Sequence, residues 1–149
     1  MRATHLILYD AECRFCRWTL GWILRWDRLH ELEPVALQDP RAAELLPEMA
    51  PEQRLSSWHL VAPDGGVHSA GAAAAPLLRL LPEGRAPAAL LAAMPGAVER
   101  TYAWTARNRG RLGGRLSERA LARADALIAD RRGLPSKRPV TTQPEEATR

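Results

Sequence analysis

The chain has 149 residues, 46% of them hydrophobic, and a formal net charge of +4. This is enough for one compact core, and no stretch approaches the roughly 18 consecutive apolar residues of a membrane span. Composition thus excludes a long membrane-spanning helix, and because no signal-peptide pattern precedes the first predicted strand, we expect a cytoplasmic protein.

The positive charge is concentrated in the last third of the chain. Residues 1–98 carry nine basic and eleven acidic side chains, whereas residues 99–139 carry eleven basic and four acidic ones. Because such asymmetry attracts anions, we expect an anionic partner or a membrane surface to meet the basic C-terminal region. Arginines that merely solvate helix faces are the alternative, and no specific nucleic acid is predicted.

Hydrophobic periodicity over the first half of the chain predicts a strand, a helix, a second strand and a short helix. They are expected at residues 5–9, 13–29, 33–37 and 39–46. Asp39 and Pro40 are typical of a helix N-cap and first helical position. The long helix carries an aromatic stripe that we expect to pack in the core. Its members are Phe15, Trp18, Trp22 and Trp26.

The second half predicts a β-hairpin followed by helices. Strands at 58–62 and 67–68 flank a Pro-Asp-Gly-Gly turn, and His59 and His68 are expected to point outward. Helices are expected at 71–81, with a kink or restart at Pro76, at 86–94, at 95–108, and after an N-cap at Ser117. Glycines at positions 110, 113 and 114 are expected to interrupt the chain between the last two helices.

This order of elements predicts a thioredoxin-like α/β domain: a small mixed sheet flanked by helices, with additional C-terminal helices. We expect a single domain over residues 1–133, in which the helical extension begins at about residue 95. Residues 134–149 are expected to form a disordered tail, because they are polar and follow a proline.

The two cysteines of the chain, Cys13 and Cys16, lie where the first strand runs into the first helix. In a reducing compartment this spacing is more typical of a redox or metal motif than of a structural disulfide. A helix N-terminus favours a thiolate, and Arg14 and Arg17 add positive charge, so Cys13 is the expected nucleophile. Cys16 is expected to be more buried and to resolve a mixed disulfide.

Two carboxylates beside the cysteines oppose thiolate formation. We expect Asp10 to cap the turn between strand and helix, with proton transfer as the alternative, and Glu12 to be solvated. Two other interpretations of the cysteines stay open: incidental buried thiols, and a zinc site shared across a dimer. Zinc takes four ligands, and the histidines are isolated along the sequence. No cofactor is expected other than the redox-active disulfide itself.

Residues 9–16 fit an Asp-x-x-Cys-x-x-Cys signature, and over roughly residues 5–115 the chain resembles the DCC family of predicted thiol–disulfide oxidoreductases, which have a thioredoxin-like fold. Further shared features are Arg25-Trp26-Asp27, Leu37-Gln38, Asp64-Gly65, Tyr102 and Ala106-Arg107-Asn108-Arg109. The resemblance implies that Cys13 attacks, Cys16 resolves and Asp10 is a functional neighbour.

The resemblance also implies thiol–disulfide exchange with a protein or small-molecule disulfide or thiol. The match at Arg107, Asn108 and Arg109 implies a role near the dithiol or in binding an anionic group. A non-catalytic redox-sensing or partner-binding domain with a basic helical surface is the alternative. Ala11 replaces a usual glycine, and no proline precedes the third strand, where thioredoxin-like enzymes place a cis-proline beside the substrate groove. Substrate binding is therefore expected to differ from that of general protein-disulfide enzymes.

Overall fold

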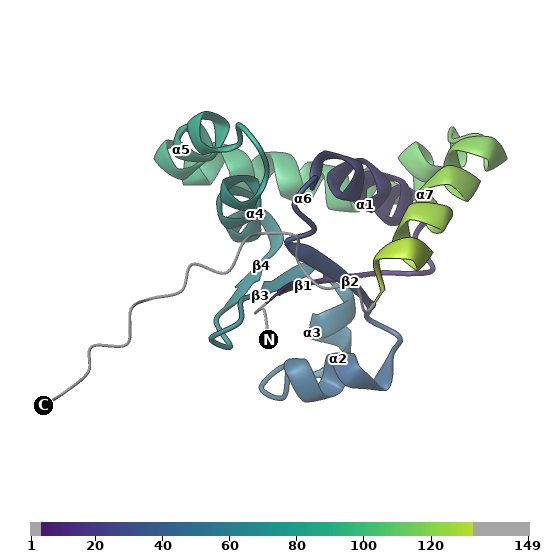
Figure 1. Ribbon diagram of the computed structural model, residues 1–149, viewed down its shortest axis with the longest axis horizontal. Helices are drawn as coiled ribbons and strands as arrows, with labels where there is room; N and C mark the ends of the chain where they lie inside the picture. Colours follow the sequence, from purple (N-terminus) through teal and green to yellow (C-terminus); the bar gives the residue numbers. More distant parts are fainter. Residues whose placement is uncertain (1–3, 133–149) are drawn as a thin grey trace, which may run out of the picture.

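The computed structural model describes residues 4–132, in which a four-stranded mixed sheet lies between two layers of helices (Figure 1). The strands are β1 (His5–Tyr9), β2 (Leu32–Ala36), β3 (His59–Val61) and β4 (Val67–Ser69). Their order across the sheet is β2-β1-β3-β4, with β1 and β2 parallel and the other neighbours antiparallel. The tail expected at 134–149 lies outside the described residues.

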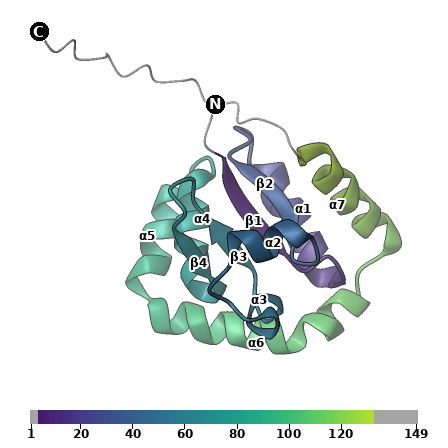
Figure 2. The same cartoon turned by 90° about the horizontal axis from the view of Figure 1, so that it is seen from below.

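Helices cover both faces of this sheet. They are α1 (Arg14–Trp26), α2 (Pro40–Leu45), α3 (Pro51–Leu55), the 3₁₀ helix η1 (Ala70–Ala73), α4 (Ala74–Leu80), α5 (Arg85–Ala93), α6 (Pro95–Gly114) and α7 (Glu118–Arg131). Figures 1 and 2 show α2 and α3 on one face and α1, α4, α6 and α7 on the other. None of the helices within residues 4–132 is long and apolar enough to cross a bilayer.

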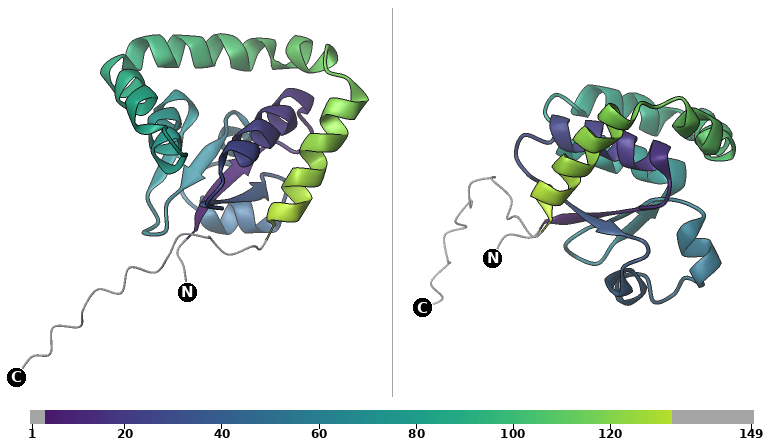
Figure 3. Two further views of the ribbon diagram at one scale, coloured as in Figure 1. Left: turned by 45° about the horizontal axis from the view of Figure 1, so that its top comes forward. Right: turned by 90° about the vertical axis from the view of Figure 1, so that its right-hand side faces the viewer.

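Two apolar clusters hold the layers together. Successive side chains of a strand point to opposite faces, so Ile7 and Tyr9 of β1 join the cluster that includes α1, α4 and α7, whereas Leu8 joins the cluster that includes α2. A parallel β1–α1–β2 unit followed by an antiparallel hairpin and a helix confirms the predicted thioredoxin-like fold class. Three further helices, α5, α6 and α7, follow this unit, and α6 and α7 return across α1 (Figure 3).

The helix α6, which precedes the last helix α7, is longer than predicted, because its glycines do not end it. A Cβ at Gly113 would lie 3.1 Å from the backbone nitrogen of Phe15, so glycine lets α6 approach the start of α1 closely. Gly110 faces open space within the helix. The helix-propensity penalty of such glycines, roughly 1 kcal/mol each, is outweighed here by packing against α1 and η1. The Ser117 cap was predicted correctly, since its Oγ accepts the Ala120 amide at 3.2 Å.

The core face of α1 also differs from the prediction. Leu20, Gly21 and Leu24 are buried, whereas Trp22 and Trp26 are 55% and 39% exposed. The aromatic stripe is therefore not a core stripe throughout its length. The reason is the close approach of α7: a Cβ at Gly21 would lie 2.6 Å from the Cβ of Ala124.

The helix α1 ends at Trp26 rather than near Leu29, and Asp27 is its C-cap residue. Arg131 of α7 donates to the carbonyl oxygens of Leu24 and Asp27. The carboxylate of Asp27 accepts the amides of Glu31 (2.9 Å) and Leu32 (3.1 Å) and pairs with Arg131 of α7 at 2.7 Å. Both charged side chains are buried. These bonds direct the chain from α1 into β2 and join α7 to the end of α1.

The segment around β3 contains an element that was not predicted and a histidine whose predicted orientation was wrong. The short helix α3, which begins at Pro51, was not expected. His59 points inward and is 1% exposed. Its Nε2 lies 2.9 Å from the Arg54 carbonyl oxygen and its Nδ1 lies 2.6 Å from Ser69 Oγ, so polar partners compensate its burial.

Candidate functional site

The cysteine pair lies at the start of α1, where the chain leaves β1. Cys13 is the N-cap, with extended backbone angles, and Cys16 lies in the first turn. The two are joined by a disulfide, and their Cα atoms are 5.2 Å apart. The Cys16 amide donates a hydrogen bond to Cys13 Sγ at 3.2 Å. Because unpaired amides and the helix dipole converge at this end, negative charge on the Cys13 sulfur is favoured there.

The arginines that follow the cysteines are not free charges. Arg14 lies 2.8 Å from the Glu118 carboxylate and also donates to the carbonyls of Gly113 and Leu116. Arg17 lies 3.1 Å from the Asp125 carboxylate. Both arginines therefore join α1 to the α6–α7 region, and acidic partners offset the positive charge expected to act on the sulfur.

Asp10 organises the turn that leads into the dithiol. Its Oδ1 accepts hydrogen bonds from the Glu12 amide (3.0 Å) and the Gln38 side chain (2.8 Å), and Gln38 in turn accepts the Ala11 amide. The expected capping role of Asp10 is thus present in the structure. Glu12 is exposed, as expected.

One residue of the Ala-Arg-Asn-Arg motif reaches this turn. Arg109 Nη1 lies 3.4 Å from Asp10 Oδ2, and both residues line the same cavity as Cys16. Asn108 instead donates to the Trp104 carbonyl of its own helix, and Arg107 is exposed. The structure therefore brings together Asp10, Cys16 and Arg109 but leaves Arg107 and Asn108 outside.

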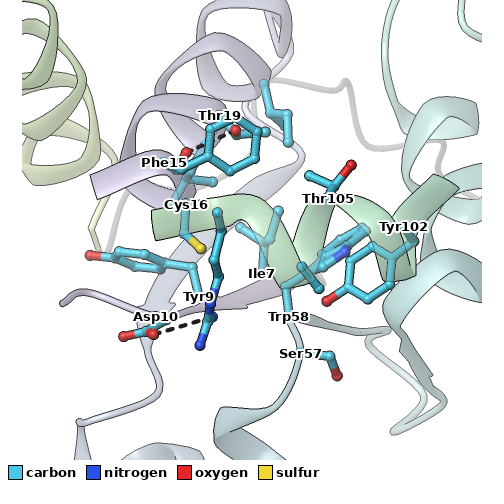
Figure 4. Close-up of a pocket in the computed structure, with 14 residues that line it drawn as sticks. Ile7, Tyr9, Asp10, Phe15, Cys16, Thr19, Ser57, Trp58, Tyr102 and Thr105 are labelled. Carbon is cyan, nitrogen blue, oxygen red and sulfur yellow. Dashed lines mark hydrogen bonds and ion pairs between the residues drawn. The ribbon is translucent and has the colours of Figure 1, made fainter. Parts of the chain in front are cut away.

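A cavity of ≈ 250 Å³ opens beside Cys16 (Figure 4). Its walls come from four parts of the chain. From β1 with the residue that follows it, and from α1, come Ile7, Tyr9, Asp10, Phe15, Cys16, Thr19, Leu20 and Ile23. From the segment before β3 and from α6 come Ser57, Trp58, Tyr102, Thr105, Ala106 and Arg109. Most of these residues were not predicted as site residues.

Part of this wall carried a signal in the sequence. Tyr102, Ala106 and Arg109 follow one another at helical spacing, which places them on one face of α6. Burial raises the pKa of Tyr102, and contacts with Trp58, Arg109 and Ser57 partly oppose this shift. Trp58 carried no such signal, because its place depends on how α6 crosses the sheet.

Metal-ligating side chains are not clustered in the described part of the chain. Within residues 4–132 no group of three or more His, Cys, Asp or Glu side chains lies close enough together to hold a metal ion.

Comparison with known proteins places the dithiol in a family. No curated protein and no solved structure matches the chain. The family model for DCC1-like thiol-disulfide oxidoreductases matches residues 7–115, which run from β1 through the dithiol and the cavity to the end of α6. Because this match spans well over half of the sequence and includes both cysteines, the chain belongs to the DCC1-like thiol-disulfide oxidoreductase family.

Proposed function

We propose that this protein catalyses dithiol–disulfide exchange through Cys13 and Cys16. The observation that carries the proposal is the position of Cys13 Sγ at the N-cap of α1, where it accepts a hydrogen bond from the Cys16 amide and is paired with the Cys16 sulfur. A thiolate is the attacking species in exchange, and this position favours it. A cytoplasmic location suits the proposal, because a reducing compartment supplies the thiols that reset the dithiol.

The proposed cycle begins with both cysteines reduced. The Cys13 thiolate attacks one sulfur of a substrate disulfide, forming a mixed disulfide and releasing the other substrate sulfur as a thiolate. Cys16 loses its proton and attacks the Cys13 sulfur, which closes the Cys13–Cys16 disulfide and releases the second substrate thiolate. The substrate gains two electrons and the dithiol loses two. A cellular dithiol then reduces the protein and is itself oxidised to a disulfide.

Asp10 is the proposed acceptor of the Cys16 proton. The side chains of Asp10 and Cys16 line the same cavity. The Asp10 side chain is only 15% exposed, which limits its contact with solvent protons. Arg109 beside it holds the carboxylate in place. No bound cofactor is required, because the electrons pass between sulfur atoms only.

A Cys16→Ser variant tests the exchange reaction. Since the variant forms mixed disulfides but cannot resolve them, it should accumulate substrate linked to Cys13, which non-reducing gels and mass spectrometry detect. The Cys13→Ser/Cys16→Ser double variant should trap nothing. Absence of any trapped species, both in cells and with an added disulfide, would overturn the proposal.

A basic face on α6 favours a second candidate function, docking on an anionic lipid surface. Arg100, Trp104, Arg107 and Arg111 follow at intervals of four, three and four residues, so they share one face. All are exposed, Trp104 by 54%. Within residues 4–132 none of these arginines forms an ion pair. Basic residues interleaved with tryptophan are typical of helices that lie on anionic bilayers.

Vesicle sedimentation tests this second candidate. The protein should bind phosphatidylglycerol vesicles in a salt-sensitive way and should not bind phosphatidylcholine vesicles. The Arg100→Glu/Arg111→Glu variant should lose binding, whereas Arg79→Glu, an exposed change on α4, should keep it. Loss of both cysteines should leave binding intact. Equal binding of the two vesicle types, or of the two arginine variants, would contradict docking through α6.

A further inference from the structure

The cavity beside Cys16 is large enough to hold a small molecule. Its volume is ≈ 250 Å³, far above the roughly 10–15 Å³ that one water requires, and it is partly open to solvent. A larger groove of ≈ 390 Å³ adjoins it at Trp58, Tyr102 and Thr105, but that groove contains no cysteine. A concave, mostly apolar pocket with a few polar groups is the usual form of a ligand site, so we expect the cavity at the cysteine pair to receive a ligand.

The chemistry of the walls restricts that ligand. Ile7, Leu20 and Ile23 form an aliphatic side, and Phe15 and Trp58 add aromatic rings. The charged groups, Asp10 and Arg109, pair with each other at the Cys16 end. Such walls match an apolar body, while the sulfur chemistry lies at one end of the cavity.

The helix α6 encloses the cavity on the side that faces β3. In thioredoxin-like enzymes the segment before the third strand borders the substrate groove, and here that segment contains Ser57 and Trp58. Tyr102 of α6 lies against Ser57 and Trp58, with which it lines the cavity. An extended polypeptide that ran along this segment would have to displace α6.

We infer that the substrate is a small disulfide with an apolar body, rather than a disulfide within an extended protein chain. The inference rests on the proposed function. The body of the substrate occupies the cavity between α1 and α6, which places its disulfide at the Cys16 wall, beside the reduced cysteine pair. Bonds and electrons are exchanged as in the cycle above: the substrate disulfide becomes two thiols, and the dithiol becomes the Cys13–Cys16 disulfide.

Rate constants for three disulfides test this inference. Stopped-flow measurement gives the rate constant for the reaction of the reduced protein with each of 4,4′-dithiodipyridine, bis(2-hydroxyethyl) disulfide and insulin. Each rate constant is divided by the rate constant of dithiothreitol with the same disulfide. The aromatic disulfide should show the largest ratio, by about tenfold. Ala106→Phe fills the cavity from α6 and should reduce the ratio for the aromatic disulfide about tenfold, more than it reduces the ratio for the hydroxyethyl disulfide. Ala103→Phe, the same change on α6 at a residue outside the cavity wall, should leave both ratios unchanged.

The outcomes separate the inference from the function on which it rests. If insulin reacts as fast as the aromatic disulfide, or if Ala106→Phe and Ala103→Phe behave alike, the substrate inference is wrong while exchange stands. If the protein reduces none of the disulfides faster than dithiothreitol does, and Cys16→Ser traps nothing, the proposed function itself is wrong. Circular dichroism checks folding, and Thr105→Leu on the same wall replaces Ala106→Phe if that variant does not fold, with the same expectation.

Discussion

Asp10 combines two tasks that a substitution can separate. Its Oδ1 holds the turn before Cys13 through Glu12 and Gln38, while its negative charge faces Arg109 beside Cys16. Asparagine keeps an oxygen that accepts both hydrogen bonds but cannot take a proton at neutral pH. The turn and the chemistry therefore respond differently to Asp10→Asn.

We expect Asp10→Asn to slow resolution of the mixed disulfide by about a hundredfold, the lower range of general-base contributions. The rate of the variant should rise with pH, because solvent must then remove the Cys16 proton. Single-turnover kinetics across pH measures both effects. Glu12→Gln is the matched control, since Glu12 is exposed, and its rate should equal that of the unmodified protein. Equal resolution rates in all three proteins would contradict the role of Asp10.

His59 is a buried group whose protonation opposes folding. Its Nε2–H donates to the Arg54 carbonyl and its Nδ1 accepts the Ser69 hydroxyl proton, an arrangement that suits the neutral ring. Burial lowers the pKa of His59 below 6.5, and the hydrogen bond to Arg54 opposes this less strongly. The unfolded chain thus binds a proton near pH 6.5 that the folded chain takes up only at lower pH.

Stability should therefore fall as the pH drops below about 6.5, by at most about 1.4 kcal/mol per pH unit from this group. Above that pH the contribution is fully present, since both states are neutral. Urea unfolding at pH 7.5 and 5.5 measures the loss, which should be smaller in His59→Gln. His68→Gln, on the exposed strand β4, should lose as much as the unmodified protein. If His59→Gln loses equally, the ring is not held neutral.

Among the packed elements, two helix glycines differ in whether a neighbouring helix contacts them. A Cβ at Gly21 of α1 would lie 2.6 Å from the Ala124 Cβ of α7, whereas a Cβ at Gly110 of α6 meets no atom within 4 Å. Glycine therefore allows the contact at the first position and only weakens the helix at the second.

Gly21→Ala should destabilise the fold by about 1–3 kcal/mol through overpacking of α1 against α7. Gly110→Ala should stabilise it by roughly 0.5–1 kcal/mol, because alanine favours the helix without a clash. The free energy of unfolding, measured by urea titration, distinguishes the two. Stabilisation by both substitutions would show that α7 does not pack on Gly21.

Elements with local signals could be predicted from the sequence, and elements defined by distant contacts could not. Asp39 and Ser117 cap helices through hydrogen bonds to residues two or three positions ahead, so sequence alone reveals them. The length of α6 depends instead on Gly113 meeting Phe15 of α1, and the burial of Gly21 in place of Trp22 depends on the contact between Gly21 and Ala124 of α7. Both contacts join residues about a hundred positions apart.

The candidate site shows the same division at the scale of the molecule. Cys13, Cys16 and Asp10 lie within one turn of chain and were predicted together, because strand, turn and helix N-terminus are local features. The cavity could not be predicted, because its far wall is α6, which the sheet and the hairpin separate from the dithiol in sequence. Arg109 was predicted by family resemblance alone, and its ion pair with Asp10 gives that match a physical role.

The contacts between the C-terminal helices and the rest of the molecule imply that they unfold together with the sheet. Arg131 of α7 pairs with Asp27 at the end of α1, where both groups are buried, and Arg14 bonds the carbonyls of Gly113 and Leu116. Opening α7 alone would leave Asp27 buried and without its cation, which is strongly unfavourable. Residues 5–131 should therefore form one cooperative unit, as the predicted single domain requires.

Native-state hydrogen exchange followed by mass spectrometry tests this unit. Slowly exchanging amides in α7 and in β1 should open with the same free energy, within about 1 kcal/mol, because both require global unfolding. In Arg131→Ala both values should fall together by about 3–5 kcal/mol, the range for breaking a buried ion pair. Arg17→Ala, which removes a partly exposed pair with Asp125 between the same two helices, should lower both by less than about 1 kcal/mol. A lower opening free energy for α7 than for β1 in the unmodified protein would instead define α6–α7 as an appendage that unfolds independently of the dithiol.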